Sequence, residues 1–289
     1  MTTVLVPEPR ALDAHAGELR LRYYLWDGAG PTVVMLHPSR GYGRVWDGVV
    51  PYLLPHFRVI SLDQRGHGDT DRPARGYAGE DFALDLEGFL DKLELERVML
   101  VGHSLGGRAA QIFAGNHPER VTKLAIVGGP HAECFDATAE QFEANRRTVE
   151  AQRRSPQSFA SEQLAREHFA QFSPWRELNA QQRDHVIRHN MNRERDGVLS
   201  FKYDGQHVAD GLSHMVDDLR KYVCRISCPV LFIVRRQGHD HLTPEIAAKL
   251  AGYFEKAEVK IVFVAGVHFV QLENPHAVGE ELRKFLLPA

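Results

Sequence analysis

The stretch 102–107, Gly-His-Ser-Leu-Gly-Gly, is the part of the chain best suited to nucleophilic chemistry. It follows an apolar run at 98–101 and opens a stretch with a helical pattern. A serine hydroxyl is a poor nucleophile, so it must be exposed beside a base and near preorganised N–H donors. A sharp turn from strand to helix gives that exposure, and the helix start offers free N–H groups. The pattern predicts Ser104 as a nucleophile; the alternative is a glycine-rich helix start.

A base for this serine should lie at the same edge of the sheet. His268 follows the last apolar run, 259–264, and precedes a helical stretch at 275–286. Ligands bind at the carboxyl ends of parallel strands, where this loop would lie. We therefore predict His268 as the general base. His276 is the nearest rival, but it would stand in the first turn of the last helix.

The base needs a carboxylate that holds the correct tautomer and stabilises the imidazolium. Asp240 is the only acid on the loop after the apolar run 229–234, because Glu245 is better used in the first turn of the next helix. We predict Asp240 as this acid, with Glu133 as the alternative. Histidines flank Asp240 on both sides, but no other ligand for a metal is implied. No metal site is predicted.

Composition restricts the classes of partner. The 289 residues carry a net charge of −3, which gives no electrostatic reason to expect nucleic acid or an anionic membrane. No apolar run approaches the roughly 18 residues that a membrane helix needs, and the first ten residues lack the basic region followed by an apolar region that is typical of a signal peptide. Three cysteines form no disulfide framework. We expect a soluble, cytoplasmic protein with a small-molecule substrate; a homodimer is left open.

Apolar runs bounded by turn residues alternate with helical patterns along the chain, which is typical of an α/β fold with a mostly parallel sheet and helices on both faces. Strands are predicted at 19–25, 32–36, 58–62, 98–101, 124–127, 229–234 and 259–264, and helices at 80–93, 105–116, 244–254 and 275–286. The last five of these strands are apolar enough to be covered on both faces.

The alternation of apolar runs and helical patterns stops over 131–222, a polar stretch without a convincing buried strand. Its apolar residues recur at roughly helical intervals, which favours several amphipathic helices. We therefore predict a core made of 1–130 and 223–289, with a helical insertion at 131–222 between two strands of the core.

These motifs together resemble the α/β-hydrolase superfamily, in its capped branch of small-molecule hydrolases, over nearly the whole chain. The matching pieces are Leu-His-Pro-Ser at 36–39 with Trp46, Asp-Gln-Arg-Gly-His-Gly at 63–68 followed by Asp-Arg-Pro at 71–73, the stretch 102–107, Asp-His-Leu at 240–242, and 266–275. The order Ser, Asp, His is the order that this fold uses. The resemblance implies that 131–222 forms a cap, or lid, over the active site. It also implies an oxyanion hole made by the backbone N–H groups of Leu105 and Ser39.

One position departs from the family pattern. Most relatives have glycine where this chain has Pro38, and proline offers no N–H. The loop donor must then be Ser39 or Arg40. Arg40 is either a solvated loop residue or a group that binds a substrate carboxylate. His103 and Trp175 are the other candidate substrate contacts.

The residues predict hydrolysis of an ester, lactone or related acyl bond through an acyl-enzyme on Ser104, without a cofactor. Haloalkane dehalogenases and epoxide hydrolases are similar but place aspartate at the nucleophile position. Carbon–carbon bond hydrolases usually have asparagine before the serine and tryptophan after the base, where this chain has His103 and Phe269. Carbon–carbon bond or enamide hydrolysis by the same triad stays an alternative, as does a ligand-binding receptor that retains the fold.

Overall fold

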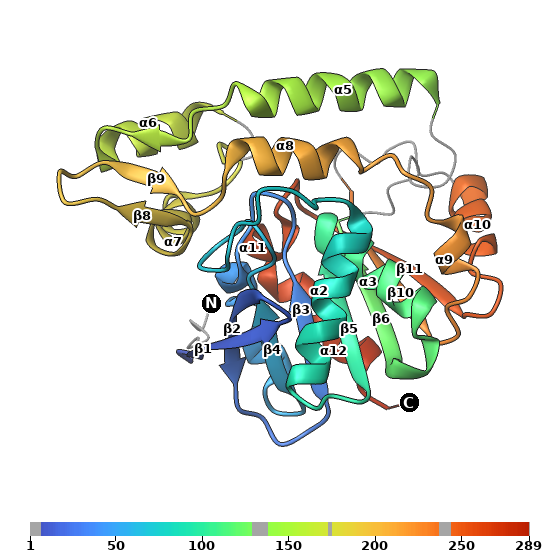
Figure 1. Ribbon diagram of the computed structural model, residues 1–289. Helices are drawn as coiled ribbons and strands as arrows, with labels where there is room; N and C mark the ends of the chain where they lie inside the picture. The colour runs from blue at the N-terminus through green and yellow to red at the C-terminus, as the bar shows by residue number, and fades with distance from the viewer. Residues whose placement is uncertain (1–6, 129–137, 173–174, 237–243, 289) are drawn as a thin grey trace.

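An eight-stranded sheet forms the centre of the protein in a computed structural model that describes residues 7–128, 138–172, 175–236 and 244–288 (Figure 1). Its strand order is β1-β2-β4-β3-β5-β6-β10-β11. Strand β2 pairs antiparallel with β1 and β4, and the other pairs are parallel, so the predicted mostly parallel sheet is confirmed. The strands are β1 (Arg10–Ala16), β2 (Leu19–Trp26), β3 (Thr32–Leu36), β4 (Arg58–Leu62), β5 (Val98–His103), β6 (Val121–Val127), β10 (Val230–Arg235) and β11 (Val259–Val264).

Helices cover both faces of this sheet because its central strands are apolar on both faces. In β3, Val34 and Leu36 contribute to one hydrophobic cluster, whereas Val33 and Met35 contribute to the other. This is the alternation that a pleated strand imposes. The first cluster includes residues of α2 (Gly79–Lys92), α3 (Leu105–Asn116), α9 (Arg220–Val223) and α10 (Pro244–Gly252). The second includes residues of η1 (Gly43–Trp46), α1 (Val50–Leu53), α11 (Val270–Glu273) and α12 (Pro275–Leu286). A short turn of helix, η2 (Pro118–Arg120), precedes β6.

The two edge strands differ from the prediction. Strand β11 was expected to be covered on both faces, but Lys260 and Phe263 are exposed. The reason is its position at the edge, where only β10 pairs with it. At the opposite edge, β1 was not predicted because polar residues such as Asp13 and His15 interrupt its apolar pattern. Across the described ranges, every helix is too short or too polar to cross a membrane.

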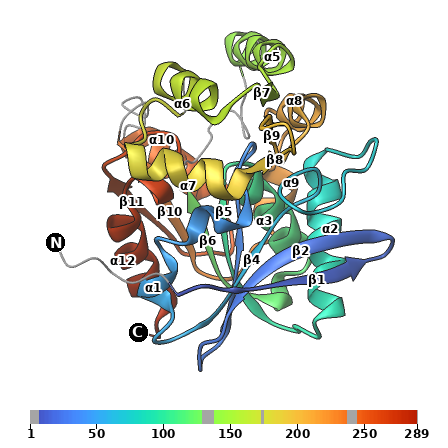
Figure 2. The same ribbon diagram turned by 90° about the vertical axis from the view of Figure 1, so that its left-hand side faces the viewer.

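The segment between β6 and β10, described at 138–172 and 175–219, is here called the cap segment. Both views place it above the end of the sheet where β5 leads into α3 (Figures 1 and 2). Its elements are α5 (Ala139–Arg153), β7 (Ser158–Phe159), α6 (Glu162–Gln171), α7 (Ala180–Asn190), β8 (Met191–Arg193), β9 (Leu199–Phe201) and α8 (Gly205–Ser213). The prediction of helices alone is wrong here, because β7, β9 and β8 form a small antiparallel sheet. These strands have two or three residues, too few for an alternating pattern to be recognised.

The polar residues of the cap segment include the signals that start its helices. Thr138, Ser161, Asn179 and Asp204 each stand at the N-cap, where the side-chain oxygen accepts a hydrogen bond from a backbone N–H of the first turn. Such caps satisfy donors that have no partner within the helix. A segment with few apolar residues can therefore still form defined helices.

Glycine is required where α3 packs against the sheet. A Cβ atom on Gly102 would lie 2.4 Å from the carbonyl oxygen of Gly106, and one on Gly106 would lie 2.5 Å from the carbonyl oxygen of Leu36. Both neighbours are backbone atoms, which cannot move without shifting β3 or α3. The turn between β5 and α3 therefore depends on the absence of these two side chains.

We expect Gly106→Ala to lower the free energy of unfolding by about 1–3 kcal/mol or more, because an added methyl group overpacks this contact. Gly252→Ala is the matched control, since a Cβ atom there meets nothing within 4 Å. Alanine should be neutral or stabilising by up to about 1 kcal/mol at that helical position. Urea denaturation of both variants measures the difference. Equal stability of the two variants would contradict this account.

Candidate active site

Ser104 stands at the sharp turn between β5 and α3. Its backbone has φ +50° and ψ −112°, a conformation that residues with a side chain rarely adopt. Serine at a helix N-cap normally accepts a hydrogen bond from the first turn, but the Ser104 side chain makes no such bond. The hydroxyl is therefore not used to cap α3. A strained turn that presents an uncommitted hydroxyl is the geometry expected of a nucleophile.

His268 lies on the loop between β11 and α11, beside the end of β5. Its ring centroid is 5.7 Å from that of His103, the residue that precedes Ser104. The adjacent Phe269 packs edge-on against His103, with centroids 6.3 Å apart. Ser104 makes no hydrogen bond to His268 in this structure, and catalytic hydrogen bonds are often long until substrate binds. The predicted nucleophile and base thus belong to neighbouring loops at the carboxyl edge of the sheet.

Glu273 holds the loop that carries His268, a role that the sequence did not indicate. Its Oε2 accepts the backbone N–H of Val267 at 2.6 Å, and its Oε1 accepts that of Phe269 at 2.9 Å. Both oxygens thus bind the residues that flank His268. Burial raises the pKa of Glu273, whereas these two backbone donors lower it. Its place in the single turn before Asn274 is the only local signal of this role.

The predicted acid cannot be placed. Asp240 and the histidines on either side of it lie outside the described residues, and so does the alternative acid Glu133. Asp240 therefore stays a prediction from the sequence.

The loop after β3 supplies one candidate oxyanion donor. The N–H of Arg40 donates to Nε2 of His67 at 3.2 Å, so it is already used. The N–H of Gly41 donates to the carbonyl of Pro38 at 2.9 Å. Within the described part of the chain, the N–H groups of Ser39 and Leu105 have no hydrogen-bond partner. Of the two loop donors considered, Ser39 is the one that this geometry leaves available.

Two buried histidines shape this loop in their neutral form. His37 lies between the carbonyl of Pro38, at 2.8 Å from Nδ1, and the N–H of Gln64, at 3.0 Å from Nε2. Nδ1 must then carry the proton and Nε2 must accept. His67 adopts the same tautomer, because its Nδ1 lies 2.9 Å from the carbonyl of Arg65 and its Nε2 accepts the N–H of Arg40. Burial lowers the pKa of His67 to about 4 and that of His37 well below its ordinary value.

The three predicted substrate contacts, His103, Trp175 and Arg40, lie in different surroundings. His103 is only 2% exposed and packs among His268 and Phe269. Trp175, in the cap segment, is 3% exposed and stacks on Phe269 with centroids 5.1 Å apart and planes at 16°. It also packs against Phe201 of β9. Trp175 is therefore a contact between the cap segment and the loop of the predicted base. Arg40 lines a cavity beneath the cap segment.

A cluster of potential metal ligands lies elsewhere between cap and core. Ligand atoms of Asp47, His185 and His189 lie within 4.8 Å of one another. Asp47 forms an ion pair with Arg44 at 2.7 Å, and His185 is bound by Tyr42 at 2.8 Å and by Asp47 at 3.2 Å. Asp47 and His185 are therefore already paired, and a cation there would meet the charge of Arg44. The cluster joins α7 to the core.

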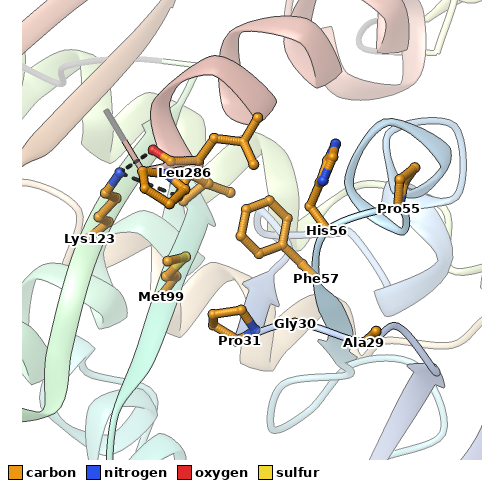
Figure 3. A pocket seen from close by; sticks show the side chains of 11 residues that line it. Ala29, Gly30, Pro31, Pro55, His56, Phe57, Met99, Lys123 and Leu286 are labelled. Carbon is orange, nitrogen blue, oxygen red and sulfur yellow. Dashed lines mark hydrogen bonds between the residues drawn. The ribbon is translucent and has the colours of Figure 1, made fainter.

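An apolar cavity of about 500 Å³ lies at the amino-terminal end of the central strands, away from Ser104. Figure 3 shows the side chains that line it. Met99 and Lys123, near the amino ends of β5 and β6, contribute to its lining. Nζ of Lys123 donates to the carbonyls of Phe285 and Leu287 at 2.6 and 2.7 Å, and so binds the end of α12. Ligand sites of parallel sheets lie at the carboxyl ends of the strands. This cavity is therefore separate from the site around Ser104.

A family model described as alpha/beta hydrolase fold matches residues 31–275. The chain belongs to the α/β-hydrolase family. Two solved structures agree with this chain in fold at 22% identity. E-2-(acetamidomethylene)succinate hydrolase has a TM-score of 0.80 over 96% of this chain and 99% of its own, and a marine microorganism esterase has 0.74 over 92% and 98%.

Curated relatives of this α/β-hydrolase match over shorter stretches. It is 44% identical over 106 residues to 2-hydroxy-6-oxo-2,4-heptadienoate hydrolase of Pseudomonas putida, which is 35% of this chain and 38% of that protein. It is 34% identical over 100 residues to 2-(acetamidomethylene)succinate hydrolase of Mesorhizobium japonicum, which is 35% and 36%. The matched stretches span only about a third of the length of these two relatives.

The neutral histidines make a prediction about pH. Between about pH 6.5 and 4, the unfolded chain binds a proton at His67 and the folded protein does not. Stability is therefore retained above pH 6.5 and lost as the pH falls toward 4, by about 2–3 kcal/mol for this residue at pH 4.5. His67→Gln should remove that part of the dependence.

Urea denaturation of the wild type and of His67→Gln at pH 7.5 and 4.5 measures this pH-dependent loss of stability. Buried Asp63, whose pKa is raised to about 6, has a pH dependence of the opposite sign, but it is present in both proteins and cancels in their difference. A stability difference that is the same at both pH values would disprove the role given to His67.

Proposed function

We propose that this protein is a serine hydrolase that cleaves an ester or related acyl bond of a small molecule. The observation that carries the proposal is the strained turn at Ser104, whose hydroxyl is not used as a helix cap. The His268 loop lies beside that turn, in contact with the residue before the serine. Membership of the α/β-hydrolase family supports the same reading.

In the proposed reaction, Oγ of Ser104 attacks the substrate carbonyl while His268 accepts the hydroxyl proton. The N–H groups of Leu105 and Ser39 stabilise the oxyanion, and Leu105 adds the positive end of the α3 dipole. His268 then gives the proton to the leaving group, and the acyl group stays on Ser104. Water then attacks the acyl carbonyl while His268 accepts its proton. His268 returns this proton to Oγ of Ser104 as the acid leaves. Asp240 is proposed to orient His268, and the cap segment to act as a lid that excludes water.

A second function uses the same residues on a different bond. The printed names of two relatives describe hydrolases of a dienoate and of an acetamidomethylene succinate. Those names favour carbon–carbon bond or enamide hydrolysis as the alternative to ester hydrolysis. A turnover screen of alkyl esters, lactones, enamides and simple diketones separates these bond types.

Ser104→Ala should lower kcat on any true substrate on the order of 10⁶-fold, because nothing replaces the attacking oxygen. The wild type should react covalently with a fluorophosphonate probe and the variant should not. Ser213→Ala, at an exposed serine of α8, is the control and should label normally. Labelling of Ser104→Ala would assign the nucleophile elsewhere, whereas absence of labelling in the wild type would favour the receptor alternative.

Glu273→Gln should lower kcat for a p-nitrophenyl ester by up to about 100-fold with little change in KM, because a displaced base is costly even over short distances. Glutamine has one acceptor oxygen and can keep only one of the bonds to Val267 and Phe269. The control is Glu281→Gln, which removes an ion pair of α12 with Lys284. A thermal midpoint that falls while kcat stays unchanged would show that Glu273 acts on stability alone.

A further inference from the structure

A cavity of about 330 Å³ lies between the cap segment and the loop after β3. Arg40 lines it from the core, Gln152 from α5, and Trp175, Phe201 and Tyr203 from the rest of the cap segment. This volume is at the small end of the range for sites that enclose a small molecule. Five of its eleven lining residues carry an aromatic or imidazole ring, and two, Arg40 and Arg154, are arginines. The apolar cavity of Figure 3 is lined by other residues.

The Arg40 guanidinium has no acidic partner in the described part of the chain, and its buried Nε has no hydrogen-bond partner. Burial lowers the pKa of Arg40. Two other arginines with little exposure form ion pairs, Arg44 with Asp47 at 2.7 Å and Arg65 with Asp85 at 2.5 Å, and the buried Arg108 donates to the carbonyl of Asp217. Arg40 is partly buried, and a charge removed from water without an acidic partner is costly, which makes its retention informative.

The groups around Arg40 leave its charge unbalanced. Burial raises the pKa of Tyr203, so that side chain stays a neutral hydroxyl. Burial lowers the pKa of His168, which therefore stays uncharged near neutral pH. Gln152 is 3% exposed, and its buried Nε2 has no partner. Arg154, the other cation of the lining, pairs with Glu150 at 2.7 Å. The cavity thus combines one unpaired cation with neutral hydrogen-bonding groups.

The backbone of Arg40 is held on both sides. Its φ is +61°, in the left-handed region that disfavours residues with a side chain. Its N–H donates to His67, and its carbonyl accepts Nδ2 of Asn190 at 3.0 Å. Asn190 ends α7, so the cap segment itself fixes this residue. Because the backbone of Arg40 is already fixed, binding of an anion costs less entropy than it would on a mobile loop.

We propose that this cavity binds a carboxylate of the substrate, with Arg40 as its ionic partner; the assignment rests on the function proposed above. Arg40 directly follows the oxyanion donor Ser39. Trp175 lines the cavity and stacks on Phe269, next to His268. A substrate that reaches from the cavity to Ser104 would therefore carry its carboxylate on the part of the molecule that lies beneath the cap segment. The planar guanidinium matches a carboxylate through two parallel hydrogen bonds.

The test compares monomethyl with dimethyl esters of succinate, glutarate and adipate, with acid release followed at constant pH. The quantity measured is the ratio of kcat/KM for the half-ester to that for the diester. The wild type should prefer the half-ester of one chain length, and Arg40→Met should lower the ratio by about 100-fold. Arg40→Lys should fall between them, because it keeps the charge but loses the planar fork. Arg147→Gln, at an exposed arginine of α5 outside the cavity lining, should keep the wild-type ratio.

Equal rates on half-esters and diesters in the wild type overturn the proposal, and so does an unchanged ratio in Arg40→Met. If Arg40→Met does not fold, the wild-type preference and Arg40→Lys decide. A further measurement separates this site from the reaction: glutarate should raise the melting temperature of Ser104→Ala, and Arg40→Met should abolish that rise. Protection by glutarate without turnover of any ester would retain the site and reject the hydrolase. If inorganic phosphate raises the melting temperature and glutarate does not, the proposal that the cavity binds a carboxylate is wrong.

Discussion

The packing of α3 against β3 and β5 fixes the backbone conformation on which the rest of the site depends. Ser104 adopts its positive φ because the helix enters the core at a distance that only glycine at 102 and 106 permits. A conformation of this kind costs of order 1–3 kcal/mol. Burial offsets that strain, since all residues of α3 from Leu105 to Gly115 are buried. The Ser104 turn is therefore held by the hydrophobic core, and its hydroxyl is not used as a helix cap.

The loops around Ser104 are held mainly by side chains that bind backbone groups. Glu273 binds the N–H groups on either side of His268, and His37 and His67 bind the loop that contains Ser39. The bonds of His37 and His67 require a neutral ring, which burial maintains by lowering the pKa of both histidines. The same burial that fixes the loops thus makes their integrity sensitive to acid. Stability and geometry of the site have a common physical origin.

Elements that are mostly buried, or that lie next to proline, were predicted well from the sequence. The bounds of β3, β4, α3 and α12 agree with the prediction to the residue. Strand β1 was missed because one of its faces is solvated, and the short strands of the cap segment lack a measurable period. Glu273 was missed because a carboxylate that binds backbone N–H groups leaves no motif. Asp240 rests on the sequence alone.

Arg40 shows why local sequence could not decide between a solvated residue and a substrate contact. Its environment is made by residues distant in the chain: Asn190, which binds its carbonyl, is 150 residues away, and Tyr203 belongs to the same cap segment. Tyr203 stacks on Phe201, Phe201 on Trp175, and Trp175 on Phe269 beside the predicted base. One continuous series of aromatic rings therefore connects the Arg40 cavity to the His268 loop. Because the first three rings belong to the cap segment, displacing that segment would open the cavity and uncover the His268 loop together. The proposed recognition of the substrate and the proposed exclusion of water thus depend on the same packed surface.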